Sequence, residues 1–337
     1  MKPEHKTIQR RSIMQTIAEQ PNRCNRSAMV QFPFFVLVLF LLQACQSLNI
    51  ESARTLAEEG RNVAAAGSSQ IFVSDMEFRN AREAEVFMHA YAGAEKPDQI
   101  LEYYKSIMLE LSKRKTVFTN LASVYTIFYD LSSNDAPARI ETAVNKLGDA
   151  VNDYSTTVSS TPFLSNEPVT KAGAIAHAAM TARKKNMIMQ SSVLIRERLH
   201  RLLKLLENPL VRQQLVTWKT NLAQNRAAVA QMLMSHGVLD TTPLLNQMGS
   251  DAGLQGAPDA ADIIRKNTRL SNGLEQVIVY RMQNNLLAID AGYDATCKAI
   301  RELIHLHEQL EKGEPVTVSS VRQAIAELQS IAEQLNK

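Results

Sequence analysis

Apolar residues recur at three- and four-residue steps along most of the chain, which is the spacing that places them on one face of an α-helix. The pattern predicts a helix over residues 74–92, ended by Gly93, and a second helix that opens at Pro97. A shorter helix is predicted over residues 137–154. The stripe of the helix after Pro97 consists of Ile100, Tyr103, Tyr104, Ile107, Met108, Leu111, Val117, Phe118, Leu121, Val124, Tyr125 and Phe128.

The second half of the chain is predicted to form two long helices. One covers residues 166–236 and is interrupted at Pro209, where we expect a kink or a break. After a loop at 237–258 that is rich in Gly and Pro, the other long helix covers residues 259–312 and ends at Gly313. A last helix is predicted to reach Leu335, with Val321, Ile325, Leu328, Ile331 and Leu335 on one face.

Two long amphipathic helices joined by a loop should fold back on each other, because neither can bury its apolar stripe alone. The remaining helices would then complete a bundle. Only 12 Gly and 11 Pro are found in 337 residues, which favours long elements over many short strands. The predicted fold is therefore all-α, an elongated helical bundle built around a long antiparallel helical hairpin.

The N-terminal region has a different pattern. Residues 27–50 include no charged side chain, and their apolar core is the eleven-residue run Phe32-Pro-Phe-Phe-Val-Leu-Val-Leu-Phe-Leu-Leu42. As a helix this core spans about 16 Å, roughly half of a bilayer's hydrocarbon layer. That length, behind a basic segment, is typical of a signal peptide. The alternative is an uncleaved signal anchor, which would make the chain a single-pass membrane protein.

The apolar core ends in Leu42-Gln43-Ala44-Cys45, which resembles the lipobox of bacterial lipoprotein precursors. An aliphatic residue stands three before the cysteine and a small residue directly before it; Gln43 departs from the pattern, in which a small or aliphatic residue is usual. The resemblance implies cleavage after Ala44, a diacylglyceryl thioether on Cys45 and palmitate or another acyl chain on the new N-terminus. Position 46, directly after the cysteine, is Gln and not Asp. In this it resembles Gram-negative lipoproteins that are sorted to the outer membrane.

The expected protein is thus lipid-anchored in the cell envelope, on the outer membrane facing the periplasm. Translation could start at Met1 or at Met14, since either retains Arg23 and Arg26 before the apolar core. The expected organisation is a signal peptide at 1–44, the lipidated Cys45 with a tether to residue 70, N-terminal helices at 71–157, a linker at 158–165, and the hairpin with the last helix at 166–337. A short helix at 46–70 is the alternative to the tether.

Charge is divided unevenly along the chain. The leader before Cys45 has six basic and two acidic residues, whereas the remainder has 31 basic and 32 acidic. Nucleic-acid binding requires clustered Lys and Arg, so the near-neutral body predicts no nucleic-acid partner. The triplets 113–115 and 183–185 are basic; each is interpreted as a solvated helix face, with contact to anionic lipid head groups or to an acidic partner as the alternative. The pair Glu58-Glu59 is likewise interpreted as solvated.

The sequence predicts no catalytic residue, cofactor or metal site. His305 and His307 lie two apart on a predicted helix and point in different directions, so they cannot chelate one ion; only His307 is in phase with the buried stripe. Cys297 is expected to be a small buried hydrophobe. With no phosphate loop or nucleophile motif, we expect a protein that is not an enzyme.

The loop at 237–258 is the predicted contact site for a protein partner, because it places apolar side chains among glycines at the far end of the hairpin. The alternative is a short helix that caps the bundle end. The partner-contact candidates are Leu239, Leu244, Leu245, Met248 and Leu254.

The leading functional hypothesis is a lipid-anchored helical scaffold or adaptor that binds another protein. A carrier that holds an apolar ligand between its helices is the alternative, and an enzyme of unrecognised type is a third. The methionines that would suit a carrier are Met180, Met187, Met189, Met232 and Met234.

Overall fold

The computed structural model describes residues 28–93, 97–133, 137–158, 180–257 and 259–335. The chain divides into two units, residues 1–45 and 46–337. The side chains of the first long helix are described from Ile50 onward. All contacts reported below therefore belong to the second unit.

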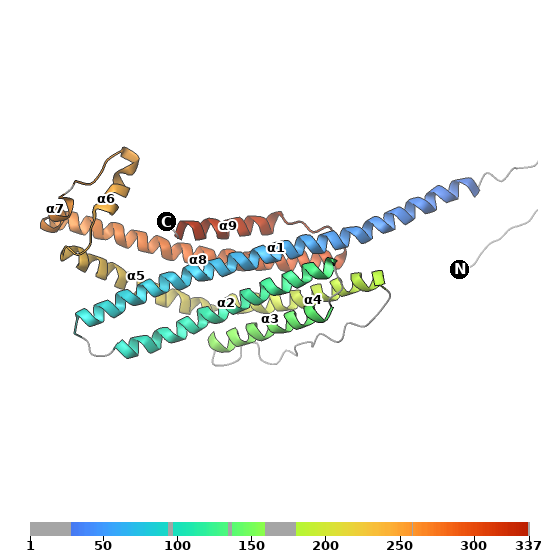
Figure 1. Cartoon of the computed structure of the whole chain (residues 1–337), viewed down its shortest axis with the longest axis horizontal. Coiled ribbons are helices and arrows are strands. Elements are labelled where there is room, and N and C mark those ends of the chain that lie inside the picture. Colours follow the sequence, from blue (N-terminus) through green and yellow to red (C-terminus); the bar gives the residue numbers. More distant parts are fainter. Residues whose placement is uncertain (1–27, 94–96, 134–136, 159–179, 258, 336–337) are drawn as a thin grey trace, which may run out of the picture. The chain divides into compact units, whose positions relative to one another are not determined.

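Every regular element in the described residues is a helix (Figure 1), which confirms the predicted all-α bundle. The elements are α1 (Ala28–Tyr91), α2 (Pro97–Ser133), α3 (Pro137–Val158), α4 (Met180–Leu206), α5 (Pro209–Ser235), α6 (Thr242–Gly249), the 3₁₀ turn η1 (Ser250–Ala252), α7 (Ala260–Lys266), α8 (Thr268–Lys312) and α9 (Ser319–Leu335).

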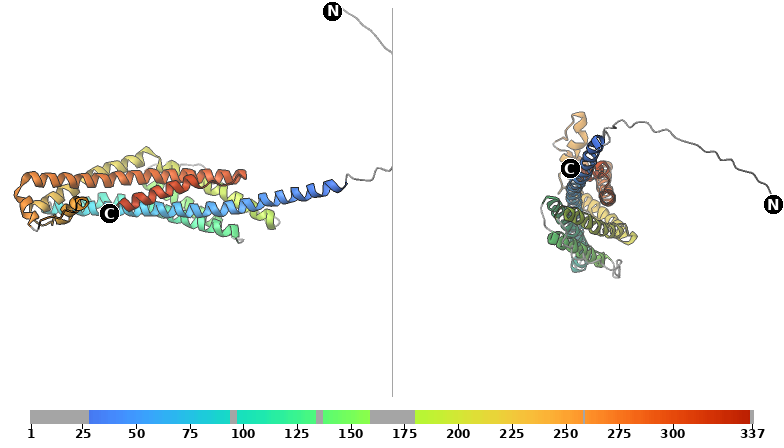
Figure 2. Two further views of the ribbon diagram at one scale, coloured as in Figure 1. Left: turned by 90° about the horizontal axis from the view of Figure 1, so that it is seen from above. Right: turned by 90° about the vertical axis from the view of Figure 1, so that its right-hand side faces the viewer.

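The predicted hairpin is formed by α4 and α5 lying along α8 (Figures 1 and 2). Hydrogen bonds join the two arms of the hairpin in reverse sequence order, as antiparallel packing requires. Ser192 is bonded to His307, the carbonyl of Leu206 accepts from Tyr293, and Gln231 donates to Glu275. The interruption expected at Pro209 is a break: α4 ends at Leu206, and α5 begins at Pro209. Asn208 caps α5 by accepting a hydrogen bond from the Leu210 amide at 2.9 Å, with Pro209 in the first turn.

The remaining helices cover this hairpin. α2 packs on α3 and on α4, and α9 turns back along α8 after Gly313, whose φ is +75°. The predicted apolar face of α9 is buried as expected, at Val321, Ile325, Leu328, Ile331 and Leu335.

A tether at residues 46–70 is contradicted by the structure, and the helix predicted over residues 74–92 is the last part of a longer helix. Residues 46–70 are part of α1, which continues without interruption to Tyr91. Leu56, Val63 and Ile71 are completely or almost completely buried. Glu59, interpreted as solvated, is also buried, and accepts a 2.6 Å hydrogen bond from Arg322 of α9. A segment that looks like a linker by composition is therefore a central helix of the bundle.

Small residues explain how α1 reaches this position. Ala53, Ala57, Gly60, Ala64 and Gly67 follow one another at steps of four and three, so they form a single seam along the helix.

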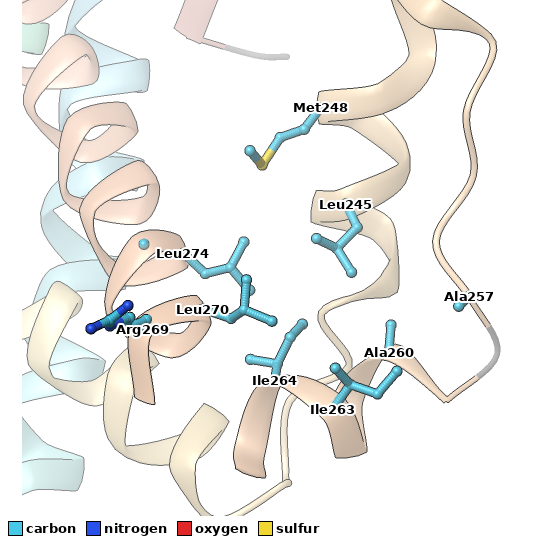
Figure 3. A pocket seen from close by; sticks show the side chains of 10 residues that line it. Leu245, Met248, Ala257, Ala260, Ile263, Ile264, Arg269, Leu270 and Leu274 are labelled. Carbon is cyan, nitrogen blue, oxygen red and sulfur yellow. The ribbon is translucent and has the colours of Figure 1, made fainter. Parts of the chain in front are cut away.

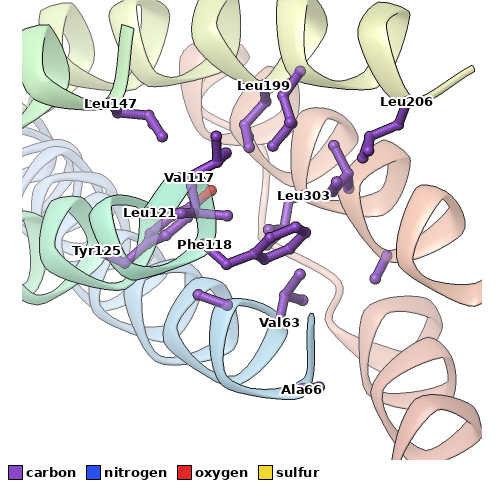
Figure 4. Packing of buried hydrophobic residues seen from close by; sticks show 14 of the residues in the cluster. Val63, Ala66, Val117, Phe118, Leu121, Tyr125, Leu147, Leu199, Leu206 and Leu303 are labelled. Atoms are coloured by element: carbon purple, nitrogen blue, oxygen red, sulfur yellow. The ribbon is translucent and has the colours of Figure 1, made fainter. Parts of the chain in front are cut away.

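Aromatic rings of α2 lie directly against the backbone of α1 at this seam (Figure 4). A methyl group added at Gly60 would overlap the ring of Tyr125, and one added at Gly67 would overlap the ring of Phe118. Only glycine leaves room for rings at this depth. The compositional feature that suggested a tether is thus what allows close packing.

The helix expected over residues 259–312 is broken at Asn267, which separates α7 from α8. The backbone of Asn267 is extended, and its side chain accepts hydrogen bonds from the amides of Arg269 and Leu270, which caps α8. The break was not predicted because Asn267 lies in an otherwise helical pattern with no Pro or Gly beside it.

Several expectations fall outside the described residues. The leader up to residue 27 and the linker after Val158 are among them, as is the start of the long helix at 166–179. Ala44 and Cys45 lie within α1, but their side chains are not described. Among the residues whose side chains are described, no helix is both long and apolar enough to cross a membrane.

We predict that Gly60→Ala lowers the free energy of unfolding by about 1–3 kcal/mol, because the added methyl group must displace the Tyr125 ring in a filled core. The matched control is Gly273→Ala in α8, where nothing lies within 4 Å of an added Cβ. The control should gain roughly 0.5–1 kcal/mol, because alanine favours a helix over glycine. Urea unfolding monitored by circular dichroism measures both; equal effects at the two positions would contradict the packing of α1 on α2.

Candidate binding site at the tip of the helical hairpin

The chain reverses direction between α5 and α8 through a segment that we call the tip, residues 236–274. Gly237 ends α5 with a φ of +69°. Asp240 accepts a hydrogen bond at 2.9 Å from the amide of Thr242, the first residue of α6. This bond holds the pKa of the Asp240 carboxyl below its usual value. After η1, Gly253 adopts a φ of +68°, and the chain returns through α7 to α8.

The tip shares a small apolar core with the end of α5. Met234, Ile264 and Leu274 are buried together, and Leu244 and Leu245 of α6 pack partly against them. No residue of α6 is itself buried. The tip is therefore held by few apolar contacts and exposes much of its apolar surface.

A cavity of about 440 Å³ opens between α6, α7 and α8. Figure 3 shows side chains from all three helices directed toward this space. One charged residue, Arg269, is among those that line it. The apolar lining includes Leu245, Met248, Ile263, Ile264, Leu270 and Leu274. The size and the apolar lining are those of a site for an apolar group.

A second hollow, of about 350 Å³, lies between α5, α8 and the start of the tip. Its apolar lining comes from Met234, Leu239, Leu244, Ile278 and Met282. Arg226, Asp240 and Arg281 add charge at this hollow, which makes it more polar than the first.

The structure separates the five residues predicted to contact a partner. Leu245 and Met248 line the first cavity, whereas Leu239 and Leu244 line the second hollow. Leu254 is 65% exposed and is not among the lining residues of either. α6 packs Leu244 and Leu245 against Ile264 and Leu274, as the predicted cap would, although no residue of α6 is itself buried. Contact of these residues with a partner stays a prediction.

Other apolar residues are exposed at this end that the hydrophobic pattern did not predict. Val238, Ile263 and Leu270 are exposed, and so are Phe87 and Tyr91 at the end of α1. Tyr91 lies beside the tip, with its hydroxyl 3.2 Å from Nε2 of His236. The end of α1 adds to the apolar surface of the tip, although it is distant in sequence.

Away from the tip, a buried polar network joins α2, α4 and α8. His307 is fully buried, with Nε2 2.9 Å from the Tyr125 hydroxyl and Nδ1 2.8 Å from Oγ of Ser192. Ser192 also lies 3.1 Å from Glu311, whose carboxylate pairs with Arg196.

The protons of this network can be assigned from the acceptors. Because the Glu311 carboxylate can only accept, Ser192 donates to it and accepts from Nδ1–H of His307. Nε2 is then the acceptor for the Tyr125 hydroxyl. Burial, with Arg196 nearby, lowers the pKa of His307 to about 3, so the ring is neutral. We interpret these groups as holding three helices together, since His307 and its two partners, Tyr125 and Ser192, are all fully buried.

The basic triplet at 113–115 is not a uniformly solvated face. Arg114 is buried between Glu110, at 2.6 Å, and the Tyr154 hydroxyl, at 3.0 Å. Burial alone would lower the pKa of Arg114, but Tyr154 and Glu110 outweigh it and raise that pKa above its ordinary value. Lys115 is exposed, as predicted for the triplet. In the second triplet, Lys185 is exposed.

Cys297 is buried as predicted, and burial raises the pKa of its thiol to about 11. Within the part of the chain that the structure describes, no three His, Cys, Asp or Glu side chains are grouped so that they could hold a metal ion. Comparison of the chain with protein-family models, curated proteins and solved structures finds no match.

We predict that His307 makes stability depend on pH. Its pKa is lower in the folded state than the ordinary value of 6.5, so the unfolded chain takes up a proton first as the pH falls. The contribution is complete above about pH 6.5 and should decline by about 2 kcal/mol on going from pH 7.5 to pH 5.

Urea unfolding at these two pH values should show that His307→Gln loses this part of the pH dependence. The control His305→Gln, on the exposed side of the same helix, should retain it. An unchanged pH dependence in His307→Gln would show that the imidazole is not buried in its neutral form.

Proposed function

We propose that this protein is a lipid-anchored helical adaptor of the bacterial cell envelope, tied to the outer membrane through Cys45 and facing the periplasm, which binds a protein partner at its tip. The observation that supports this most lies within the second unit, which begins at Gln46, directly after the lipobox-like cysteine in the sequence. In this unit α1 continues from Gln46 to Tyr91, and Tyr91 lies beside the exposed apolar tip.

The distance between Gln46 and Tyr91 follows from helix geometry. From Gln46 to Tyr91, α1 extends for about 68 Å at 1.5 Å per residue. A rigid helix of this length would hold the tip well away from the lipid head groups. A tether of the same number of residues would instead allow the tip to return to the membrane.

The tip itself has the composition of a docking surface. Val238 and Leu254 are 67% and 65% exposed, and Met248 and Leu270 add to the same end. Such a concentration of exposed apolar side chains around a cavity is typical of protein-interaction sites. The few contacts that hold α6 would let it adjust to a partner.

The cavity of about 440 Å³ favours one second candidate, a carrier of an apolar ligand. In this alternative the ligand would fill the space between α6, α7 and α8, rather than the interior between the long helices. The adaptor should be recovered with a protein bound at the tip, whereas the carrier should be recovered with an apolar small molecule.

We predict that the full chain, produced in a Gram-negative bacterium, is processed to a mature form that begins at a diacylglyceryl-modified Cys45. Mass spectrometry of the purified N-terminal peptide measures this, and Cys45→Ala should give no acylated peptide. An intact, unacylated leader in purified membranes would instead identify the uncleaved single-pass protein.

We also predict that a photo-crosslinking amino acid at Leu254 yields an adduct of one defined mass in purified envelopes. Leu210, which is 59% exposed on α5 outside the tip, is the matched position and should yield none. The Leu254 adduct should be lost when Met248→Asp is added and retained when Leu210→Asp is added. A copurified apolar small molecule without any protein adduct would favour the carrier.

A further inference from the structure

The second hollow, between α5, α8 and the start of the tip, has an amphipathic lining. Its α8 face consists of Ile278, Arg281, Met282 and Asn285, which stand at positions i, i+3, i+4 and i+7 and so lie on one side of the helix. The polar residues of this face are four residues apart, and so are its apolar residues. Polar and apolar groups therefore lie side by side along one wall of the hollow.

Thr241 leaves a hydrogen bond unmade at this hollow. It lines the hollow and is 5% exposed, yet its hydroxyl has no hydrogen-bond partner among the described residues. The residue stands directly before α6 but does not cap that helix with its side chain. A buried polar group without a partner costs about 1–3 kcal/mol, and most such groups in folded proteins are paired. An acceptor on a bound molecule would supply the missing partner.

Arg281 adds a positive charge that has no acidic partner. Its guanidinium donates to the neutral amide oxygen of Gln247 at 2.7 Å, and no acidic side chain in the described part of the chain forms an ion pair with it. The other arginine of the lining, Arg226, is paired with Glu77 of α1. Glu275, the acidic residue of α8 before this face, accepts a 2.8 Å hydrogen bond from α5. Arg281 is thus the cation of this hollow that remains to be paired.

Asp240 is the acidic residue of the lining. Its side chain is exposed and accepts a hydrogen bond from the Thr242 amide. A negative charge at the hollow repels a group with two negative charges, such as a phosphate monoester, more strongly than it repels a carboxylate. Asp240 therefore favours a ligand with a single negative charge over one with two.

We infer that the second hollow binds an amphiphilic monocarboxylate, a molecule with one carboxylate at the end of an apolar chain. The carboxylate accepts hydrogen bonds from the guanidinium of Arg281, the amide of Asn285 and the hydroxyl of Thr241. The apolar chain lies against Met234 and Met282, whose flexible side chains adjust to its shape. This site is separate from the first cavity, and it requires neither the lipid anchor nor a protein partner.

The volume of the hollow determines the length of the ligand. The hollow has about 350 Å³. At roughly 30 Å³ for a group the size of a water molecule, this space holds about twelve non-hydrogen atoms. A saturated carboxylate of about eight to ten carbons therefore fits, whereas the end of a longer chain would remain in water.

The test uses the purified full chain in phosphatidylcholine vesicles and a probe, decanoic acid with a diazirine in its chain and a terminal alkyne. After irradiation, mass spectrometry of the labelled peptides should place the label on Met234, Leu244 or Met282. Unmodified decanoate should compete with the probe. Decanamide, which has the same shape without the charge, should require at least about tenfold more to compete, because it loses the charge-assisted hydrogen bonds. Decyl phosphate should also compete less well than decanoate.

Substitutions of the polar groups test how the carboxylate is held. Arg281→Gln should raise the probe concentration for half-maximal labelling at least about tenfold, whereas Arg269→Gln, in the first cavity, should leave it unchanged. Arg281→Lys keeps the charge without the planar guanidinium and should fall between the two. Thr241→Val, which removes only the hydroxyl, should also weaken labelling. Circular dichroism should show unchanged helix content in each variant.

Asp240→Asn keeps an acceptor for the Thr242 amide and removes the negative charge. It should improve competition by decyl phosphate more than competition by decanoate. Weaker labelling in this variant would show that the site takes a zwitterion, which would overturn the inference.

Three other results would overturn it as well. They are equal labelling in Arg281→Gln and the unsubstituted chain, equal competition by decanamide and decanoate, and label on Met248 or Leu270. The last of these would place the ligand in the first cavity and support the carrier. The lipid anchor and the protein partner are tested separately, at Cys45 and Leu254, so their failure is distinguishable from failure of this site.

Discussion

The close approach of α1 to α2 is the constraint on which the rest of the bundle depends. Gly60 and Gly67 leave room for the rings of Tyr125 and Phe118, and α1 also contacts α5, α8 and α9 through its polar side chains. There Gln70 donates to the carbonyl of Ile289, while Glu59 pairs with Arg322 and Glu77 with Arg226. Bulkier residues along the seam would hold α1 away from α2 and weaken these contacts together.

Polar groups then determine how the remaining helices align. Tyr125, the residue that packs on Gly60, also donates to His307, which donates to Ser192 of α4. The ring of Tyr125 therefore takes part both in the close packing of α1 and in the polar network of α8. A slip of one turn between α2 and α8 would leave these buried groups unpaired, at a cost of several kcal/mol. The network favours one alignment among the many that an apolar stripe would allow.

The periodic features of the sequence were sufficient to predict the all-α fold, the hairpin, the restart at Pro209 and the buried face of α9. The part of α1 before residue 74 was missed because its composition is rich in Ala, Gly and Ser, which hydrophobicity does not distinguish from a linker. The break at Asn267 was missed because a side-chain cap leaves no Gly or Pro. At the tip, the five candidates were placed at the correct end of α5 and α8. Their division between two hollows depends on the fold of α6, and the pairing of Tyr125 with His307 spans 182 residues.

Amide hydrogen exchange across residues 53–67 tests the central claim, that α1 is a core helix of the bundle and not a flexible segment. The account predicts that these amides are as strongly protected as those of residues 289–310 in α8, since both segments face the same core. Exchange within seconds across residues 53–67, with α8 still protected, would contradict it. Residues 53–67 would then be a flexible segment, and the close packing of α1 on α2 would be lost.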